Sequence, residues 1–122
     1  MKCVGFFLVL PLLGWSQDLQ RVLKQGQEVF DKTCATGYCH GQRGTAGSAP
    51  RLAARGFDQD FLTDTITRGV PGTSMAGFGT TLSRPELTAV VAYLATLNGI
   101  ANPKVTGAGP TGAAEAPAVA VS

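Results

Sequence analysis

The residues most suited to chemistry lie together in one short stretch, residues 34–41, with the sequence Cys-Ala-Thr-Gly-Tyr-Cys-His-Gly. It contains two thiols, Cys34 and Cys39, followed directly by His40, which is the single histidine of the chain. Sulfur and imidazole nitrogen are strong ligands for transition metals, and thiols also form disulfides or covalent bonds to cofactors. The rest of the sequence is therefore interpreted around this stretch.

The adjacency of Cys39 and His40 is typical of covalent haem attachment. The usual signal has two residues between the cysteines and a histidine directly after the second, whereas here four residues separate them. A thioether at Cys39 fixes the next side chain beneath the porphyrin, where its imidazole reaches the iron. Gly37 at the middle of the loop allows the extra residues to bulge outward while both sulfurs reach the ring. The motif predicts one covalent haem c attached through Cys34 and Cys39, with His40 as an axial ligand.

From about residue 26 to residue 99 the chain resembles a class I cytochrome c. The shared features are an early helix with Gly26 and Phe30, the attachment motif, a segment beginning at Pro50, a loop with Met75 and a last helix with Tyr93. The resemblance implies an all-α fold, in which about three main helices and long loops surround one haem. It also implies that the first helix packs on the last one near Gly26, and that the Pro50 carbonyl accepts a hydrogen bond from the His40 ring. Two features depart from the family pattern, namely the wide cysteine spacing and Ala76 where proline is commoner.

Met75 is the expected second axial ligand. The chain has no other histidine, and Met1 belongs to an N-terminal segment that we expect to be removed. A lone methionine in a loop is more often a packing residue, but with a haem present its place between two helices favours the iron. His/Met ligation leaves no open position for a substrate, and nothing else in the chain resembles a catalytic set. The sequence therefore predicts an electron-transfer protein and not an enzyme.

Three helices are predicted to position these groups. Apolar residues recur at helical spacing between about residues 18 and 32. Asp58 is a suitable N-cap for a second helix that ends near residue 68, and a capping box beginning at Ser83 starts a third helix that ends before Asn98. The segments between the helices are rich in Gly, Thr and Ser and are expected to be loops around the cofactor.

Both ends of the chain are expected to lie outside the cytochrome c domain, which we place at residues 17–100. Residues 1–16 contain Lys2 and an apolar run that is too short for a ~30 Å hydrocarbon core, which favours a secretory signal peptide over a membrane span. A short uncleaved anchor is the alternative. Residues 101–122 are nearly all small and are expected to be a disordered tail rich in Ala, Gly and Pro. The protein is thus expected to be exported, in the periplasm or another extracytoplasmic compartment.

The charge of the chain gives no indication of a nucleic acid partner or of stable membrane insertion. The formal net charge is +2, and it falls further when Lys2 leaves with the signal peptide. The expected partners are redox proteins, such as a periplasmic dehydrogenase or a terminal oxidase. A free shuttle and a docked subunit both remain open.

Other interpretations of the motif remain open at this point. Cys34 and Cys39 in an oxidising compartment can form a disulfide that closes a short structural loop. A zinc site would need a fourth ligand beyond the two cysteines and His40. A haem-binding subunit or sensing module is a further alternative to the electron carrier. Among other side chains, Phe30, Phe61 and Tyr93 are expected in the core, and Arg51 and Arg55 are weaker candidates for pairing with the haem propionates.

Overall fold

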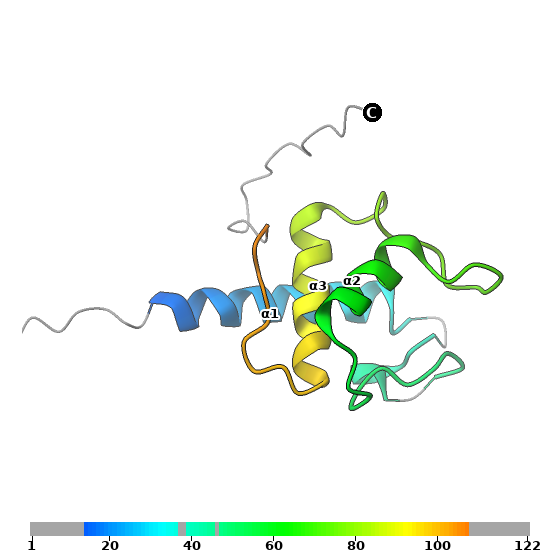
Figure 1. Cartoon of the computed structure of the whole chain (residues 1–122), viewed down its shortest axis with the longest axis horizontal. Coiled ribbons are helices and arrows are strands. Elements are labelled where there is room, and N and C mark those ends of the chain that lie inside the picture. The colour runs from blue at the N-terminus through cyan, green and yellow to red at the C-terminus, as the bar shows by residue number, and fades with distance from the viewer. Residues whose placement is uncertain (1–13, 37–38, 46, 108–122) are drawn as a thin grey trace, which may run out of the picture.

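The structure is a computed structural model that describes residues 14–36, 39–45 and 47–107. Its elements, in chain order, are α1 (Gly14–Thr33), the short 3-10 helix η1 (Gln42–Gly44), α2 (Gln59–Arg68) and α3 (Arg84–Leu97) (Figure 1). The described residues contain no strand, and the predicted all-α fold is confirmed. The expected signal peptide falls almost wholly outside these residues. Among them, no helix is long and apolar enough to cross a membrane.

The starts of α2 and α3 follow from local capping, as predicted. The Asp58 carboxylate accepts a hydrogen bond from the Phe61 amide at 2.7 Å. At α3, the Ser83 hydroxyl accepts from the Glu86 amide at 3.3 Å, and the Glu86 carboxylate accepts from the Ser83 amide at 2.8 Å. This reciprocal pair is the predicted capping box.

Two local features differ from the sequence-based expectation. Helix α1 begins at Gly14, before the predicted start near residue 18, and η1 interrupts a segment that was expected to be loop throughout. The 3-10 turn depends on unusual backbone angles, with φ of 70° at Gly41 and 55° at Arg43. Helical periodicity cannot reveal a turn this short, because it contains no repeating apolar face.

Helices α1 and α3 cross closely at Gly26, which confirms the packing that the family resemblance implies. A Cβ atom at Gly26 would collide with the Ala89 carbonyl and would lie 2.8 Å from the Cβ atom of Tyr93. One turn further along α1, the rings of Phe30 and Tyr93 have centroids 5.7 Å apart. Figure 1 shows α1 passing behind α3 at this crossing, with α2 on the other side of α3.

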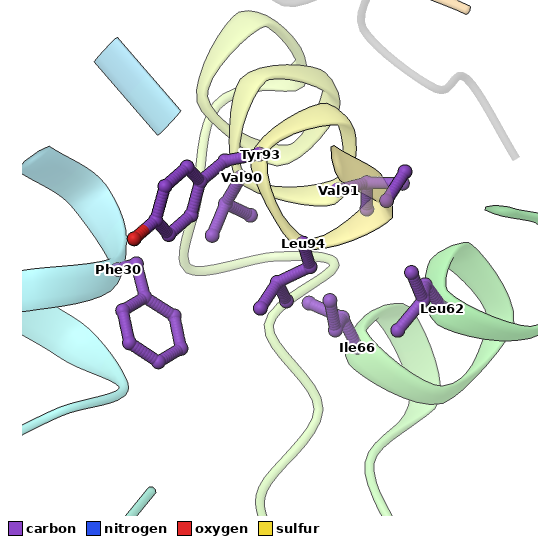
Figure 2. Close-up of a cluster of buried hydrophobic side chains, with 8 residues drawn as sticks. Phe30, Leu62, Ile66, Val90, Val91, Tyr93 and Leu94 are labelled. Atoms are coloured by element: carbon purple, nitrogen blue, oxygen red, sulfur yellow. The ribbon is translucent and has the colours of Figure 1, made fainter. Parts of the chain in front are cut away.

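The main hydrophobic cluster fills the space between the three helices (Figure 2). Its buried members are Phe30, Leu62, Ile66, Val90, Val91, Tyr93, Leu94 and Ala95. The prediction that Phe61 belongs to this core is wrong, because its side chain is 49% exposed. Its ring lies beside that of Phe57, with centroids 4.9 Å apart and the ring planes tilted by 37°. Phe61 follows the N-cap of α2, and Leu62 takes the inward position instead.

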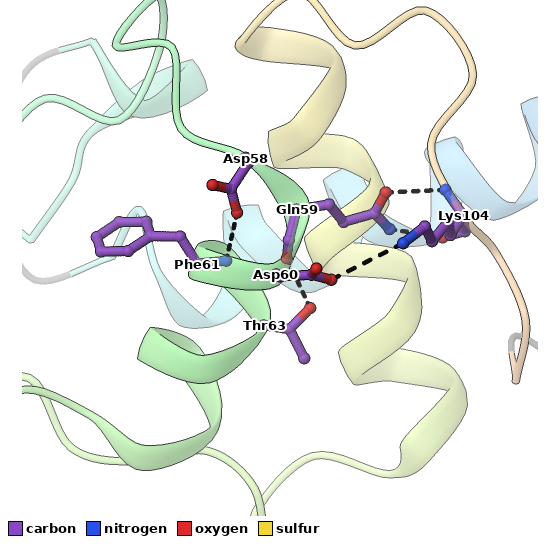
Figure 3. A network of polar contacts seen from close by, with 6 residues as sticks. All are labelled: Asp58, Gln59, Asp60, Phe61, Thr63 and Lys104. Atoms are coloured by element: carbon purple, nitrogen blue, oxygen red, sulfur yellow. Dashed lines mark hydrogen bonds and ion pairs between the residues drawn. The ribbon is translucent and has the colours of Figure 1, made fainter.

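The first residues of the expected tail pack against the helices. Pro103 is buried, and Val105 contacts a second small cluster that contains Val22 and Ala92. The amide side chain of Gln59 pairs with the backbone of Lys104, accepting from its N–H at 2.8 Å and donating to its carbonyl at 2.7 Å (Figure 3). We call residues 103–106 the C-terminal strap. The contacts of the domain therefore extend beyond the predicted boundary at residue 100.

Candidate functional site

The attachment stretch begins where α1 ends. The amide of Cys34 donates to the Phe30 carbonyl at 2.8 Å, so Cys34 occupies a fixed place at the helix terminus. The amide of His40 donates back to the Cys34 carbonyl at 3.0 Å. This bond joins the two ends of the loop, although residues 37 and 38 at its centre lie outside the described residues. The outward bulge predicted at Gly37 therefore stays a prediction.

The two cysteines have different surroundings. Cys34 is half-buried and packs against the main hydrophobic cluster, whereas Cys39 is exposed. Burial raises the pKa of the Cys34 thiol to about 11, and the charge on a nearby Cys39 thiolate adds to this shift. Cys34 is therefore a neutral thiol near pH 7. Both residues are thiols in the structure and are not joined as a disulfide.

His40 is held by its ring as well as by its backbone. The side chain is only 8% exposed, and its Nδ1 atom lies 2.8 Å from the Pro50 carbonyl oxygen. A carbonyl can only accept, so Nδ1 carries the proton and the lone pair of Nε2 remains available to a metal. The hydrogen bond that the family resemblance implies is thus confirmed.

Backbone packing keeps the Pro50 carbonyl beside His40. The Ala49 amide donates to the Cys39 carbonyl at 3.0 Å. A Cβ atom at Gly47 would collide with that same carbonyl. Only glycine therefore allows the backbone at residue 47 to pass this close to Cys39. The residues just before Pro50 therefore pack directly against Cys39 and His40.

Met75 lies in a loop that is fixed by its own hydrogen bonds. The Thr73 hydroxyl donates to the Val70 carbonyl at 2.7 Å and accepts from the Met75 amide at 3.2 Å. The Val70 amide donates to the Met75 carbonyl at 3.1 Å, which closes the loop. Beyond the loop, the Phe78 amide donates to the Ile66 carbonyl at 2.8 Å and so attaches the segment to α2. The Met75 side chain is half-buried against the main hydrophobic cluster.

The donor set fits a covalently attached haem. Cys34, Cys39 and His40 belong to one closed loop, and Met75 contacts the same hydrophobic cluster as Cys34. Two thiols, one imidazole nitrogen and one thioether match two covalent attachments and two axial ligands. Within the described residues, no group of three or more His, Cys, Asp or Glu side chains is placed to hold a metal ion.

The arginines near the site have contacts of their own. The Nε of Arg51 donates to the Ala53 carbonyl at 3.1 Å, and the guanidinium of Arg55 lies 5.8 Å from the centroid of the Phe57 ring. Both side chains are exposed, and their pairing with propionates stays a prediction. Sequence reasoning missed the influence of Arg43 on Tyr93: burial raises the pKa of the Tyr93 phenol, and the positive charge of Arg43 opposes this rise. No pattern in the sequence links these two residues.

Comparison with known proteins adds the following. Residues 21–94 match the family model described as cytochrome C oxidase, cbb3-type, subunit III. The chain is also similar to cytochrome c55X of Stutzerimonas stutzeri, with 41% identity over 61 residues. That match covers 48% of this chain and 50% of the relative, so the chain spans about half the length of the curated relative it matches. No solved structure matches significantly.

Proposed function

The chain belongs to the cytochrome c family matched by residues 21–94, and from this premise we propose that it is an exported electron-transfer protein with one covalent haem c. Cys34 and Cys39 would form the two thioether bonds. His40 and Met75 would be the axial ligands. When bound, the haem supplies a one-electron iron couple whose potential depends on these ligands and on the hydrogen bonds around them.

The observation that carries this proposal is the contact between His40 and Pro50. The Nδ1 proton is donated to the Pro50 carbonyl at 2.8 Å, which fixes the tautomer and orients the ring. A carbonyl partner also makes the remaining nitrogen more basic, as is usual for metal-ligating histidines. A surface histidine beside a structural disulfide has no need of such a buried partner.

The surroundings of Cys34 and Met75 also support the proposal. The neutral Cys34 thiol packs against the hydrophobic cluster, where a porphyrin edge would extend the apolar contact. The hydrogen bonds around Thr73 present Met75 from a preset loop, so little ordering is required when its sulfur binds. Two axial side chains leave no position for a substrate, which supports an electron carrier and not an enzyme.

The proposed partners are redox proteins of the same compartment. The matched family is described as a subunit of a cbb3-type oxidase, and this description favours a terminal oxidase as electron acceptor. A periplasmic dehydrogenase is the proposed donor.

A denaturing gel stained for haem, run beside an intact-mass measurement of the exported protein, tests the proposal. We expect staining at the position of the chain, a mass increase of one haem, and a reversible one-electron titration. Export is tested in the same preparation by the absence of residues 1–16 from the mass. A colourless chain with two cysteines joined as a disulfide would contradict the proposed function.

A further inference from the structure

Asn98, the residue that caps the end of α3, joins two distant parts of the chain through its side-chain amide. Its Nδ2 atom donates to the Leu94 carbonyl at 2.9 Å, within α3, and to the Leu52 carbonyl at 3.0 Å. Its Oδ1 atom accepts from the Arg55 amide at 2.9 Å and from the Phe57 amide at 3.3 Å. Both hydrogens of the amide nitrogen and both lone pairs of its oxygen are therefore used.

The backbone adds a further bond between the same two parts. The Ala54 amide donates to the Leu97 carbonyl at 3.0 Å, which gives a partner to one of the carbonyls that a helix end leaves unpaired. We call residues 50–57 the Pro50 segment. Residues 89–95 of α3 are all buried, so the Pro50 segment is attached to a helix that the core holds firmly.

The Pro50 segment begins with the carbonyl that orients the proposed axial histidine. This carbonyl accepts from Nδ1 of His40 at 2.8 Å. Two residues later, Leu52 is held from both sides, because its carbonyl accepts from Asn98 and its amide donates to the Gly44 carbonyl at 2.8 Å. A single residue separates Pro50 from Leu52, so a displacement of Leu52 also moves the Pro50 carbonyl.

We propose that Asn98 is a positioning residue for the axial histidine: its amide fixes the Pro50 segment to the end of α3 and so holds the Pro50 carbonyl at the His40 ring. The inference rests on the proposed function, because it concerns a ligand of the proposed haem iron. The orientation of the imidazole is thereby set from α3, a helix that contributes no proposed thioether or axial ligand.

Three variants of the haem-loaded protein test this role. Asn98→Ala removes all four side-chain hydrogen bonds. Asn98→Asp keeps the shape and both acceptor bonds and removes the bond donated to the Leu52 carbonyl, so it provides the test if Asn98→Ala does not fold. Asn102→Ala, at an exposed position shortly after α3, is the matched control.

Two measurements report on the histidine itself. The first is solvent exchange of the His40 Nδ1 proton, followed by NMR of the reduced protein. The second is the reduction potential, which is compared for the two alanine variants only, because the added charge of Asn98→Asp would itself lower it. Exchange of the Val90 amide, in the middle of α3, reports on the stability of the whole fold.

We expect the His40 Nδ1 proton to exchange about tenfold faster in Asn98→Ala and in Asn98→Asp, the factor that corresponds to one lost hydrogen bond. The Val90 amide should accelerate less. The potential of Asn98→Ala should rise, because an imidazole bonded less firmly to a carbonyl donates less to ferric iron. Asn102→Ala should match the wild type in all three measurements.

A wild-type exchange rate of the His40 Nδ1 proton in both Asn98 variants would overturn the proposal and leave Asn98 as a cap of α3 alone. A potential of Asn98→Ala equal to that of Asn102→Ala would overturn it as well. Equal acceleration at His40 and Val90 would show a general loss of stability and would contradict a positioning role. A wild-type chain without covalent haem would instead refute the proposed function, so the two failures are distinguishable.

Discussion

His40 and Met75 are held in different ways, and this difference governs what each substitution does. The ring of His40 forms its own hydrogen bond to Pro50, so changing His40 disturbs the loop as well as the donor atom. The Met75 loop is fixed through backbone atoms and the Thr73 hydroxyl. Removing the Met75 thioether therefore leaves the loop largely intact.

Met75→Ala should open the sixth position of the iron without loss of covalent haem. We expect the reduced variant to bind carbon monoxide rapidly, whereas the unmodified protein binds it slowly or not at all. The potential should fall, because the soft sulfur that favours ferrous iron is gone. Carbon monoxide difference spectra and a redox titration provide the measurement.

Ser74, the exposed residue before Met75, provides the control for this experiment. Ser74→Ala changes a side chain of similar position in the same loop and should retain the wild-type spectrum and potential. If the unmodified protein already binds carbon monoxide rapidly, Met75 is not an axial ligand, and a sensing or ligand-binding haem becomes the better interpretation.

At the scale of elements, the crossing of α1 and α3 depends on the absence of a side chain at Gly26. The atoms that a Cβ would meet belong to the backbone of Ala89 and to the first side-chain atom of Tyr93, and neither can rotate away. Relief therefore requires the two helices to separate, which would also disturb the contact between Phe30 and Tyr93.

Gly26→Val should destabilise the haem-loaded protein by about 3 kcal/mol, at the upper end of what overpacking usually costs. Chemical denaturation monitored by circular dichroism measures this change. Gln27→Ala, on the exposed face of α1, is the control and should differ from wild type by less than about 0.5 kcal/mol. Equal unfolding midpoints for Gly26→Val and Gln27→Ala would show that the helices do not meet at this residue.

The C-terminal strap leads to a second prediction at this scale. Truncation after Asn102 removes both hydrogen bonds to Gln59 and the buried Pro103. We expect a loss of about 2 kcal/mol, because two hydrogen bonds and a small apolar contact disappear together. The melting temperature should fall by several degrees in differential scanning calorimetry.

Truncation after Gly107 keeps the strap and is the matched control. This variant should have the same melting temperature as the full-length protein. If the variant truncated after Asn102 also has the melting temperature of the full-length protein, the C-terminal strap does not stabilise the fold. The domain would then end near residue 100, as the sequence predicts.

For the whole molecule, stability is divided between a helical core and the loops around the site. The buried side chains of the main cluster come from α1, α2 and α3 and contact one another directly. The segments 41–56 and 69–81 contribute mostly half-buried residues to that cluster, among them Leu52, Met75 and Phe78. We therefore expect the order of these loops to depend most on the proposed haem.

Replacing Cys34 and Cys39 together by Ala should abolish covalent haem and expose these loops to proteolysis. We expect the first cleavages within segments 41–56 and 69–81, before any cleavage in α3, together with a lower melting temperature. Limited proteolysis with mass spectrometry identifies the cut sites. A colourless double variant that resists protease as well as wild type would show that the loops fold without the cofactor.

The sequence by itself determined the features that depend on neighbouring residues along the chain. The N-cap at Asp58 and the capping box at Ser83 were predicted and are confirmed, because both depend on side chains within three residues of the helix start. The attachment motif is equally local. The contacts of Gly26 and Pro50 were also foreseen, but only through the family resemblance and not from residue spacing.

Only the tertiary structure decided which distant groups meet. Phe61 is a large apolar residue of the kind usually found in a core, yet the orientation of α2 leaves its side chain exposed. The amide side chain of Gln59 pairs with both the N–H and the carbonyl of Lys104, 45 positions away. None of these contacts leaves a periodic or local pattern. They arise because packing the helices brings particular polar atoms within reach, and a buried polar atom must then find a partner.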